Sequence, residues 1–173
     1  MWGSNVARVI VLILATGLTL IIAACIPGPR TAASTSGGAA TDPPATIECE
    51  ATEPDSMGPF YEPNAPFRSQ VGSGYVLSGR VLAVDGCLPI PNALIEFWLA
   101  SPQGDYGDDY RASLMSDSDG LYEFESHVPV PYTGRPPHIH IRVSAPAFQA
   151  LVTQHYPEEG KKRGEFDLVL VAN

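Results

Sequence analysis

The chain has 173 residues, of which 45% are hydrophobic and 17% are charged, and this balance excludes a wholly disordered chain and a coiled coil. Nineteen acidic residues against ten basic ones give a formal net charge of −9, so a nucleic-acid partner is disfavoured because the phosphate backbone would be repelled. Sixteen glycines and 17 prolines favour a turn-rich β fold over a helix bundle.

Residues 1–25 have the pattern of an export signal. Arg8 precedes an apolar run over residues 9–24, and Cys25 follows that run directly. The last four residues, Ile-Ala-Ala-Cys, resemble a bacterial lipobox, in which the cysteine is acylated and the chain is cut just before it. An uncleaved membrane helix is the alternative, because the run is near the lower length limit for crossing a bilayer. Both interpretations predict an exported domain that contacts the membrane only through its N-terminal anchor.

A linker is predicted over residues 26–46. Pro, Ala, Thr, Gly and Ser supply 18 of its 21 residues, and no apolar periodicity is present. The remaining residues, 47–173, contain every charged residue except Arg8, Arg30 and Asp42. We therefore expect this part to form a single globular domain that faces the extracytoplasmic side.

Two cysteines lie in the predicted domain, Cys49 and Cys87. An exported domain meets an oxidising environment, so we predict that they form a disulfide. Such a bridge would close a loop of nearly forty residues and stabilise the fold by about 4 kcal/mol on the chain-entropy estimate. Two buried thiols are the alternative.

The domain shows short β-rich runs separated by turn residues, and no window has sustained 3.6-residue periodicity. We therefore predict an all-β fold, an antiparallel β-sandwich preceded by the signal or anchor segment and the linker. The expected strands are residues 75–84, 93–100, 121–124, 138–144, 151–156 and 166–172.

Strict alternation in residues 138–144 places two histidines on one face of a strand. His138 and His140 share that face, while Ile139 and Ile141 share the other and belong in the core. The Cβ atoms of the two histidines would lie roughly 6.5–7 Å apart, which allows both imidazoles to bind one metal ion. A solvated or hydrogen-bonded histidine pair is the alternative.

Tyrosines are the conspicuous candidates for further metal ligands, namely Tyr106, Tyr110 and Tyr132. A phenolate is a hard anionic donor, and a bound trivalent cation lowers the phenol pKa enough to make it a ligand. Two imidazoles with two phenolates would suit Fe(III) better than Zn(II). A core ring with a hydrogen-bonded hydroxyl is the alternative for each tyrosine.

The stretch from Gly58-Pro59-Phe60-Tyr61 to Gln154 resembles the catalytic core of the intradiol ring-cleavage dioxygenases of the protocatechuate 3,4-dioxygenase type. The segments that carry this resemblance most specifically are Gly104-x-Tyr106, Pro131-Tyr132, Arg135-Pro136-Pro137-His138-Ile139-His140 and Thr153-Gln154.

The resemblance implies cleavage of a catechol-type ring between its two hydroxylated carbons with O2, giving a cis,cis-muconate-type product. It implies a non-haem Fe(III) bound by Tyr106, Tyr132, His138 and His140. Tyr132 would be the ligand that leaves when substrate binds. Arg135 would stabilise negative charge on the activated ring, with Gln154 supporting it.

Two other functions remain open at this point. The domain could be a non-catalytic exported binding module in which these residues are structural, or it could hold Zn(II) or Cu(II) on the same histidine pair. The sequence also leaves the oligomeric state undecided, and a homo-oligomer is one alternative.

Overall fold

The computed structural model describes residues 48–131 and 134–173, which belong to one unit, residues 43–173. The predicted signal, the linker, Cys25 and Tyr132 lie outside the described residues. Within the part of the chain that is described, no helix combines the length and the hydropathy needed to cross a bilayer.

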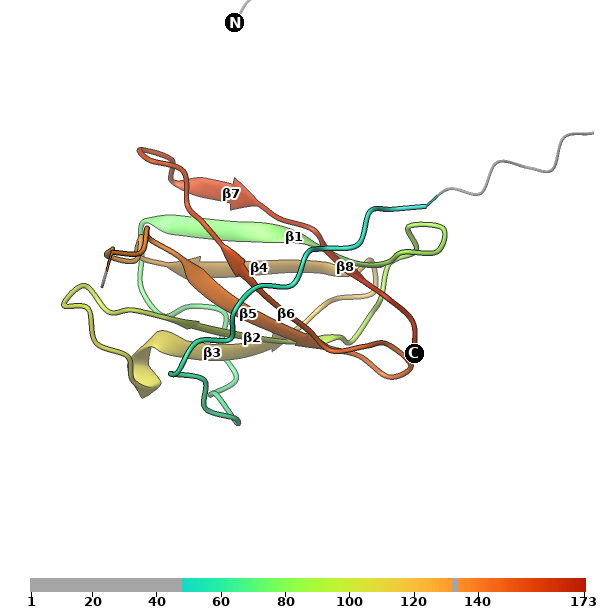
Figure 1. Cartoon of the computed structure of the whole chain (residues 1–173), viewed down its shortest axis with the longest axis horizontal. Coiled ribbons are helices and arrows are strands. Elements are labelled where there is room, and N and C mark those ends of the chain that lie inside the picture. The colour runs from blue at the N-terminus through green and yellow to red at the C-terminus, as the bar shows by residue number, and fades with distance from the viewer. Residues whose placement is uncertain (1–47, 132–133) are drawn as a thin grey trace, which may run out of the picture. The chain divides into compact units, whose positions relative to one another are not determined.

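The described residues form two four-stranded sheets (Figure 1). In the first sheet, the long central strand is β1 (Tyr75–Ala83). It pairs on one side with β4 (Leu121–Ser126) and on the other with two short strands, β7 (Arg163–Glu165) and β8 (Leu168–Leu170). The second has the order β3 (Arg111–Met115), β2 (Leu94–Leu99), β5 (Ile139–Ser144) and β6 (Leu151–His155), and a 3-10 turn, η1 (Asp108–Tyr110), precedes β3. The prediction of an all-β sandwich is confirmed.

The core lies between the two sheets and is built from the apolar positions of each alternating strand. Phe97 of β2 stacks on Phe124 of β4, with ring centroids 4.2 Å apart and an interplanar angle of 5°. Ile139 and Ile141 of β5 are fully buried on the same side. Burial of each such side chain stabilises the fold by about 1.5–3 kcal/mol. Because these apolar side chains must face the core, the opposite face of the second sheet points outward.

Two strands and the direction of two strand pairings differ from what the sequence predicts. β3 carries Arg111 and Ser113, and β7 is the charged tripeptide Arg-Gly-Glu, so neither shows an apolar pattern. β7 and β8 both run parallel to β1, whereas every other strand pair is antiparallel. The last expected run, residues 166–172, is reduced to β8 because Phe166 and Asp167 bond to β1 from a segment without regular structure.

Cross-strand register places four side chains in one row on the outer face of the second sheet. Trp98 pairs with Arg111 on one side and with His140 on the other, and His140 pairs with Gln154. Paired positions share a face, so a histidine, an indole and an amide from three strands become neighbours.

A different histidine, His155, lies between the sheets, and its titration makes the stability of the fold depend on pH. The hydroxyl of Tyr75 and Nε2 of His155 share a hydrogen bond of 2.6 Å, and burial lowers the pKa of His155 to about 4 although Glu158 acts in the opposite direction. The pKa of a histidine in the unfolded chain is about 6.5. Between this pH and about 4, the unfolded chain therefore binds more protons than the folded protein does. The stability that neutral His155 contributes is fully present above the unfolded-state pKa, and it is lost as the pH falls toward the folded-state pKa.

We expect the free energy of unfolding of the metal-free protein to fall by about 2 kcal/mol from this residue as the pH drops from about 6.5 to about 4. His155→Gln keeps an acceptor for Tyr75 but does not titrate, so its stability should fall less steeply over that range. Urea unfolding at several pH values measures the slope, and equal slopes for the two proteins would contradict the assignment.

Candidate active site

The two predicted metal-binding histidines lie side by side and are buried. His138 is 2% exposed and His140 is fully buried, and their ring centroids are 4.8 Å apart at an interplanar angle of 77°. His138 immediately precedes β5 and His140 is its second residue. Both therefore point to the outer face of the second sheet, as the alternation predicts.

Each imidazole is oriented by a different contact. Nδ1 of His138 lies 2.7 Å from the carbonyl oxygen of Pro136, which assigns the proton to Nδ1 and leaves the lone pair on Nε2. His140 instead stacks on Trp98, with centroids 4.9 Å apart and rings within 4° of parallel. Neither ring nitrogen of His140 makes a hydrogen bond of normal geometry with a described residue, although both are buried.

The electrostatics favour a neutral His140. Burial first, and then the neighbouring His138, lower the pKa of His140 to about 4. A neutral imidazole has a lone pair available at neutral pH, which is the form that binds a metal ion.

A segment without regular structure, residues 48–70, covers this face of the sheet, and we call it the strap (Figure 1). The backbone N–H of Asp55 donates to Val152 on β6 over 2.9 Å, and Ser113 on β3 donates to Pro66 over 2.8 Å. The strap thus crosses the sheet from one edge strand to the other. The strap explains why the polar face that carries His138 and His140 is buried.

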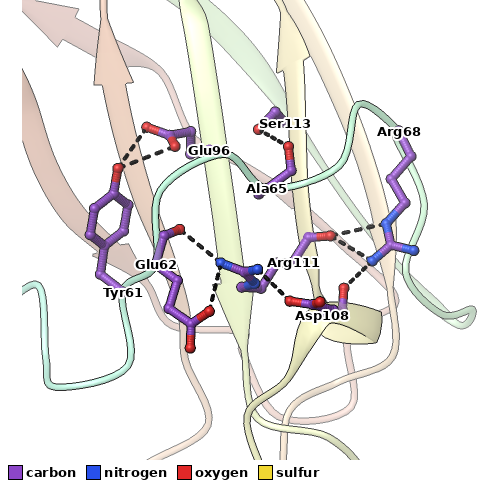
Figure 2. Close-up of polar contacts among 8 residues, drawn as sticks. All are labelled: Tyr61, Glu62, Ala65, Arg68, Glu96, Asp108, Arg111 and Ser113. Atoms are coloured by element: carbon purple, nitrogen blue, oxygen red, sulfur yellow. Dashed lines mark hydrogen bonds and ion pairs between the residues drawn. The ribbon is translucent and has the colours of Figure 1, made fainter.

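Polar contacts attach the strap to the sheet (Figure 2). Arg111 donates to the Glu62 carbonyl over 2.9 Å and forms an ion pair with Asp108. Arg68 donates back to the Arg111 carbonyl over 2.9 Å, and Ser113 donates to the Ala65 carbonyl over 3.0 Å. These contacts satisfy the polar outer positions of β3, which is why that strand needs no apolar pattern.

Gly58 brings the strap into contact with the site. Its φ is +69°, and a Cβ atom built there would lie 3.0 Å from Cε1 of His140. A side chain at this position would adopt a strained backbone conformation and press on the imidazole. Only glycine lets the strap pass this close to His140.

Of the three tyrosines that the sequence analysis singled out, Tyr106 is the one that lies beside the histidines among the described residues. Its hydroxyl is buried, and its ring centroid lies 6.1 Å from that of His140 at 60°. Tyr110 lies elsewhere, edge-on to His127, so it is not part of the cluster. The fourth expected ligand, Tyr132, is outside the described residues.

Arg135 and Gln154 are brought together as a pair. The Arg135 guanidinium donates to Oε1 of Gln154 over 2.8 Å and to the hydroxyl of Tyr156 over 3.1 Å. The Tyr156 hydroxyl in turn donates to Asp55 over 2.8 Å. The Ser56 backbone N–H holds the pKa of the Asp55 carboxyl below its usual range, so Asp55 is the anionic end of this chain.

Four residues near the site have no role predicted from the sequence, namely Tyr156, Asp55, Phe60 and Tyr61. Phe60 and Tyr61 were noted only as part of the resemblance. Asp55 lies in a segment without periodicity, and its contact with Tyr156 spans about a hundred residues, so no local pattern reveals it.

The donors present fit a ferric ion better than zinc. Among the described residues, no group of three or more His, Cys, Asp and Glu could hold a metal ion, so a zinc site built from those ligands alone is not present there. Two imidazoles beside a buried phenol form the donor set instead. A buried ring nitrogen of His140 without a well-formed hydrogen bond would otherwise cost about 1–3 kcal/mol of lost hydration, and a metal–nitrogen bond at that nitrogen would remove this cost.

A family model described as "Dioxygenase" matches residues 58–169, which include the strap from Gly58, Tyr106, both histidines and Gln154. The chain belongs to the intradiol ring-cleavage dioxygenase family. The match includes strands of both sheets, so family membership concerns most of the described domain and not one motif.

Named relatives of this dioxygenase domain agree with that family. A chlorocatechol 1,2-dioxygenase of Cupriavidus pinatubonensis is 30% identical over 145 residues, which is 64% of this chain and 56% of the relative. Catechol 1,2-dioxygenase 2 of Acinetobacter lwoffii is 34% identical over 132 residues, 56% of this chain and 48% of the relative. The chain spans about half the length of these curated relatives.

A solved structure shares the fold along its entire length. The dioxygenase domain of a dioxygenase–carbohydrate-binding protein fusion from Streptomyces sp. SirexAA-E has a TM-score of 0.65 and 26% identity, covering 72% of this chain and all of that domain. The sandwich alone is therefore a complete domain in at least one relative.

Proposed function

We propose that the domain is a non-haem Fe(III) intradiol dioxygenase that cleaves a catechol-type ring between its two hydroxylated carbons with O2, giving a cis,cis-muconate-type product. The observation that carries the proposal is the cluster of two buried imidazoles with the Tyr106 phenol on the outer face of the second sheet. Family membership supports the same reaction class.

In this proposal His138 and His140 bind the iron through ring nitrogens, and Tyr106 and Tyr132 bind it as phenolates. The ferric ion would supply Lewis-acid activation of the bound catecholate toward O2. Tyr132 would leave on substrate binding and accept a catechol proton, which makes it a base as well as a ligand.

Arg135 would supply fixed positive charge where the activated ring becomes anionic. Its contacts with Gln154 and Tyr156 limit the positions that the guanidinium can adopt, so the charge is in place before substrate arrives. The strap would exclude water from the metal ligands, since it already buries both histidines.

We also propose that Cys25 is the lipid-bearing residue of an exported protein. The apolar run that ends at Cys25 and the Pro- and Thr-rich residues 26–46 support this location. Mass spectrometry of the membrane fraction tests it. Acylated Cys25 as the new N-terminus is expected, whereas an intact residue 1–25 segment would favour the uncleaved helix.

Reconstitution with ferric iron tests the catalytic proposal. We expect one iron per chain and a red-brown colour from charge transfer between phenolate and Fe(III). Catechol added without oxygen should shift the absorption band, and admitting oxygen should give a muconate-type product. Tyr132→Phe should shift or weaken the band because one phenolate donor is lost.

The alternatives give different results in the same experiment. A colourless protein that binds no iron would indicate a non-catalytic sandwich. Zinc or copper in protein purified without added metal, with no phenolate band after iron loading, would indicate a different metal on the same histidines. Tyr110→Phe is a matched control and should leave the band unchanged, because Tyr110 packs against His127 and not against the site.

A further inference from the structure

Two neighbouring aromatic residues of the strap pack against candidate metal ligands, one directly and one through Trp98. Phe60 stacks face to face on Tyr106, with centroids 4.3 Å apart and rings within 13° of parallel. Tyr61 meets Trp98 edge-on at 5.1 Å, and Trp98 in turn stacks on His140. The dipeptide therefore closes a ring of aromatic contacts that includes a phenol and an imidazole ligand.

The Tyr61 side chain is itself fixed at its hydroxyl end. Its O–H donates to Glu96 over 3.2 Å, as Figure 2 shows, and Glu96 is 4% exposed. Nη1 of Arg142 pairs with Glu96 over 2.6 Å, and the guanidinium lies 5.9 Å from the Tyr61 ring centroid. Burial and the Glu96 charge raise the pKa of Tyr61, so it stays a neutral donor to the carboxylate.

These contacts supply orientation beyond what backbone hydrogen bonding provides. A 2.7 Å contact with the Pro136 carbonyl orients His138, whereas the backbone contact between His140 and Ser56 does not reach normal hydrogen-bond geometry, so ring packing on Trp98 contributes to the torsion of His140. Tyr106 lies between β2 and η1, outside any strand, so no ladder of backbone hydrogen bonds restrains its position.

We propose that Phe60 and Tyr61 are positioning residues that hold the Tyr106 phenol and the His140 imidazole in the geometry required for metal binding. Phe60 acts directly on the phenol, and Tyr61 acts on the imidazole through Trp98. The proposal rests on the proposed iron site. Residues that orient metal ligands typically change metal affinity by about 10–100-fold when they are altered.

The decisive variant is Phe60→Leu, which keeps apolar volume but removes the stacked ring. Phe60 is 40% exposed, so the change should leave the fold intact. We expect about tenfold or greater loss of affinity for ferric iron, measured by competition with citrate. The charge-transfer band of the iron-bound fraction should also shift, because the Tyr106 phenolate is no longer held in one orientation.

Three further variants separate positioning from general packing. Phe60→Tyr keeps the stacked ring and should retain parent affinity and spectrum. Phe67→Leu changes the same residue type in the same strap at a position that is 72% exposed, and should have no effect on either. Tyr61→Phe keeps the ring but loses the bond to Glu96, and should weaken iron binding by a smaller factor than Phe60→Leu.

The outcomes distinguish this inference from the proposed function. If the parent binds iron with a phenolate band and Phe60→Leu matches it in affinity and spectrum, the positioning role is wrong and the iron site stands. If the parent binds no iron under any loading condition, the proposed function fails and the positioning role fails with it. Thermal unfolding of each metal-free variant verifies that affinity is compared between folded proteins.

Discussion

Replacing His140 with leucine should remove iron binding and ring cleavage while leaving the metal-free protein at least as stable as the parent. The imidazole is fully buried, and its ring nitrogens make no hydrogen bond of normal geometry with a described residue. A buried polar group whose hydrogen bonds are poorly formed costs up to about 1–3 kcal/mol, and an apolar side chain of similar volume avoids that cost. We therefore expect the free energy of unfolding to be unchanged or to rise by about 1 kcal/mol.

The loss of activity should be large because the residue would be a direct ligand. Metal ions supply several kcal/mol of charge stabilisation, so losing the ion should lower turnover by about 10³-fold or more. Iron content by metal analysis, oxygen uptake with catechol and urea unfolding of the metal-free protein measure the three effects. A structural histidine would show the opposite pattern, with stability reduced and iron retained.

His127 provides the matched control for His140→Leu. Its Nε2 lies 2.8 Å from the carbonyl oxygen of Ala100, so the ring has a partner in the fold. His127→Leu should cost about 1 kcal/mol of stability through the lost hydrogen bond and leave iron binding intact. If His140→Leu and His127→Leu behaved alike, the ligand role of His140 would be contradicted.

The parts of the fold that follow from alternation were predictable from the sequence. Ile139 and Ile141 are buried between the sheets, which places His138 and His140 on the other face, as expected. β3 and β7 were not predictable in this way. The outer residues of β3 bond to the strap, and β7 is a charged edge strand held by backbone pairing to β1, so neither depends on an apolar pattern.

The site was predictable only in part, for a similar reason. The spacing of His138 and His140 indicates two ligands on one face, and the family resemblance implies Tyr106, Tyr132, Arg135 and Gln154 as further members. The burial of the two histidines depends on the strap, whose sequence has no periodicity and whose contacts are with strands far along the chain. Such long-range packing of an irregular segment leaves no local signature.

Removing the link between Cys49 and Cys87 should cause the largest loss of stability of any change considered. The structure joins these residues by a disulfide across a sequence separation of 38, with Cα atoms 5.3 Å apart. Opening a loop of this length returns about 4 kcal/mol of conformational entropy to the unfolded chain. For a domain of this size that corresponds to a fall in Tm of about 10–20 °C.

The effect on iron binding should be much smaller, because the disulfide anchors only the start of the strap. Beyond Cys49, the N–H of Thr52 donates to Val169 over 3.1 Å and that of Asp55 donates to Val152 over 2.9 Å, so the strap remains attached near the site. The double variant Cys49→Ser with Cys87→Ser should therefore unfold earlier yet bind iron with nearly parent affinity at low temperature. Calorimetry and iron titration measure the two quantities. A Tm within about 2 °C of the parent would contradict the stabilising role, and a tenfold loss of affinity in the folded variant would show that the disulfide also orders the ligands.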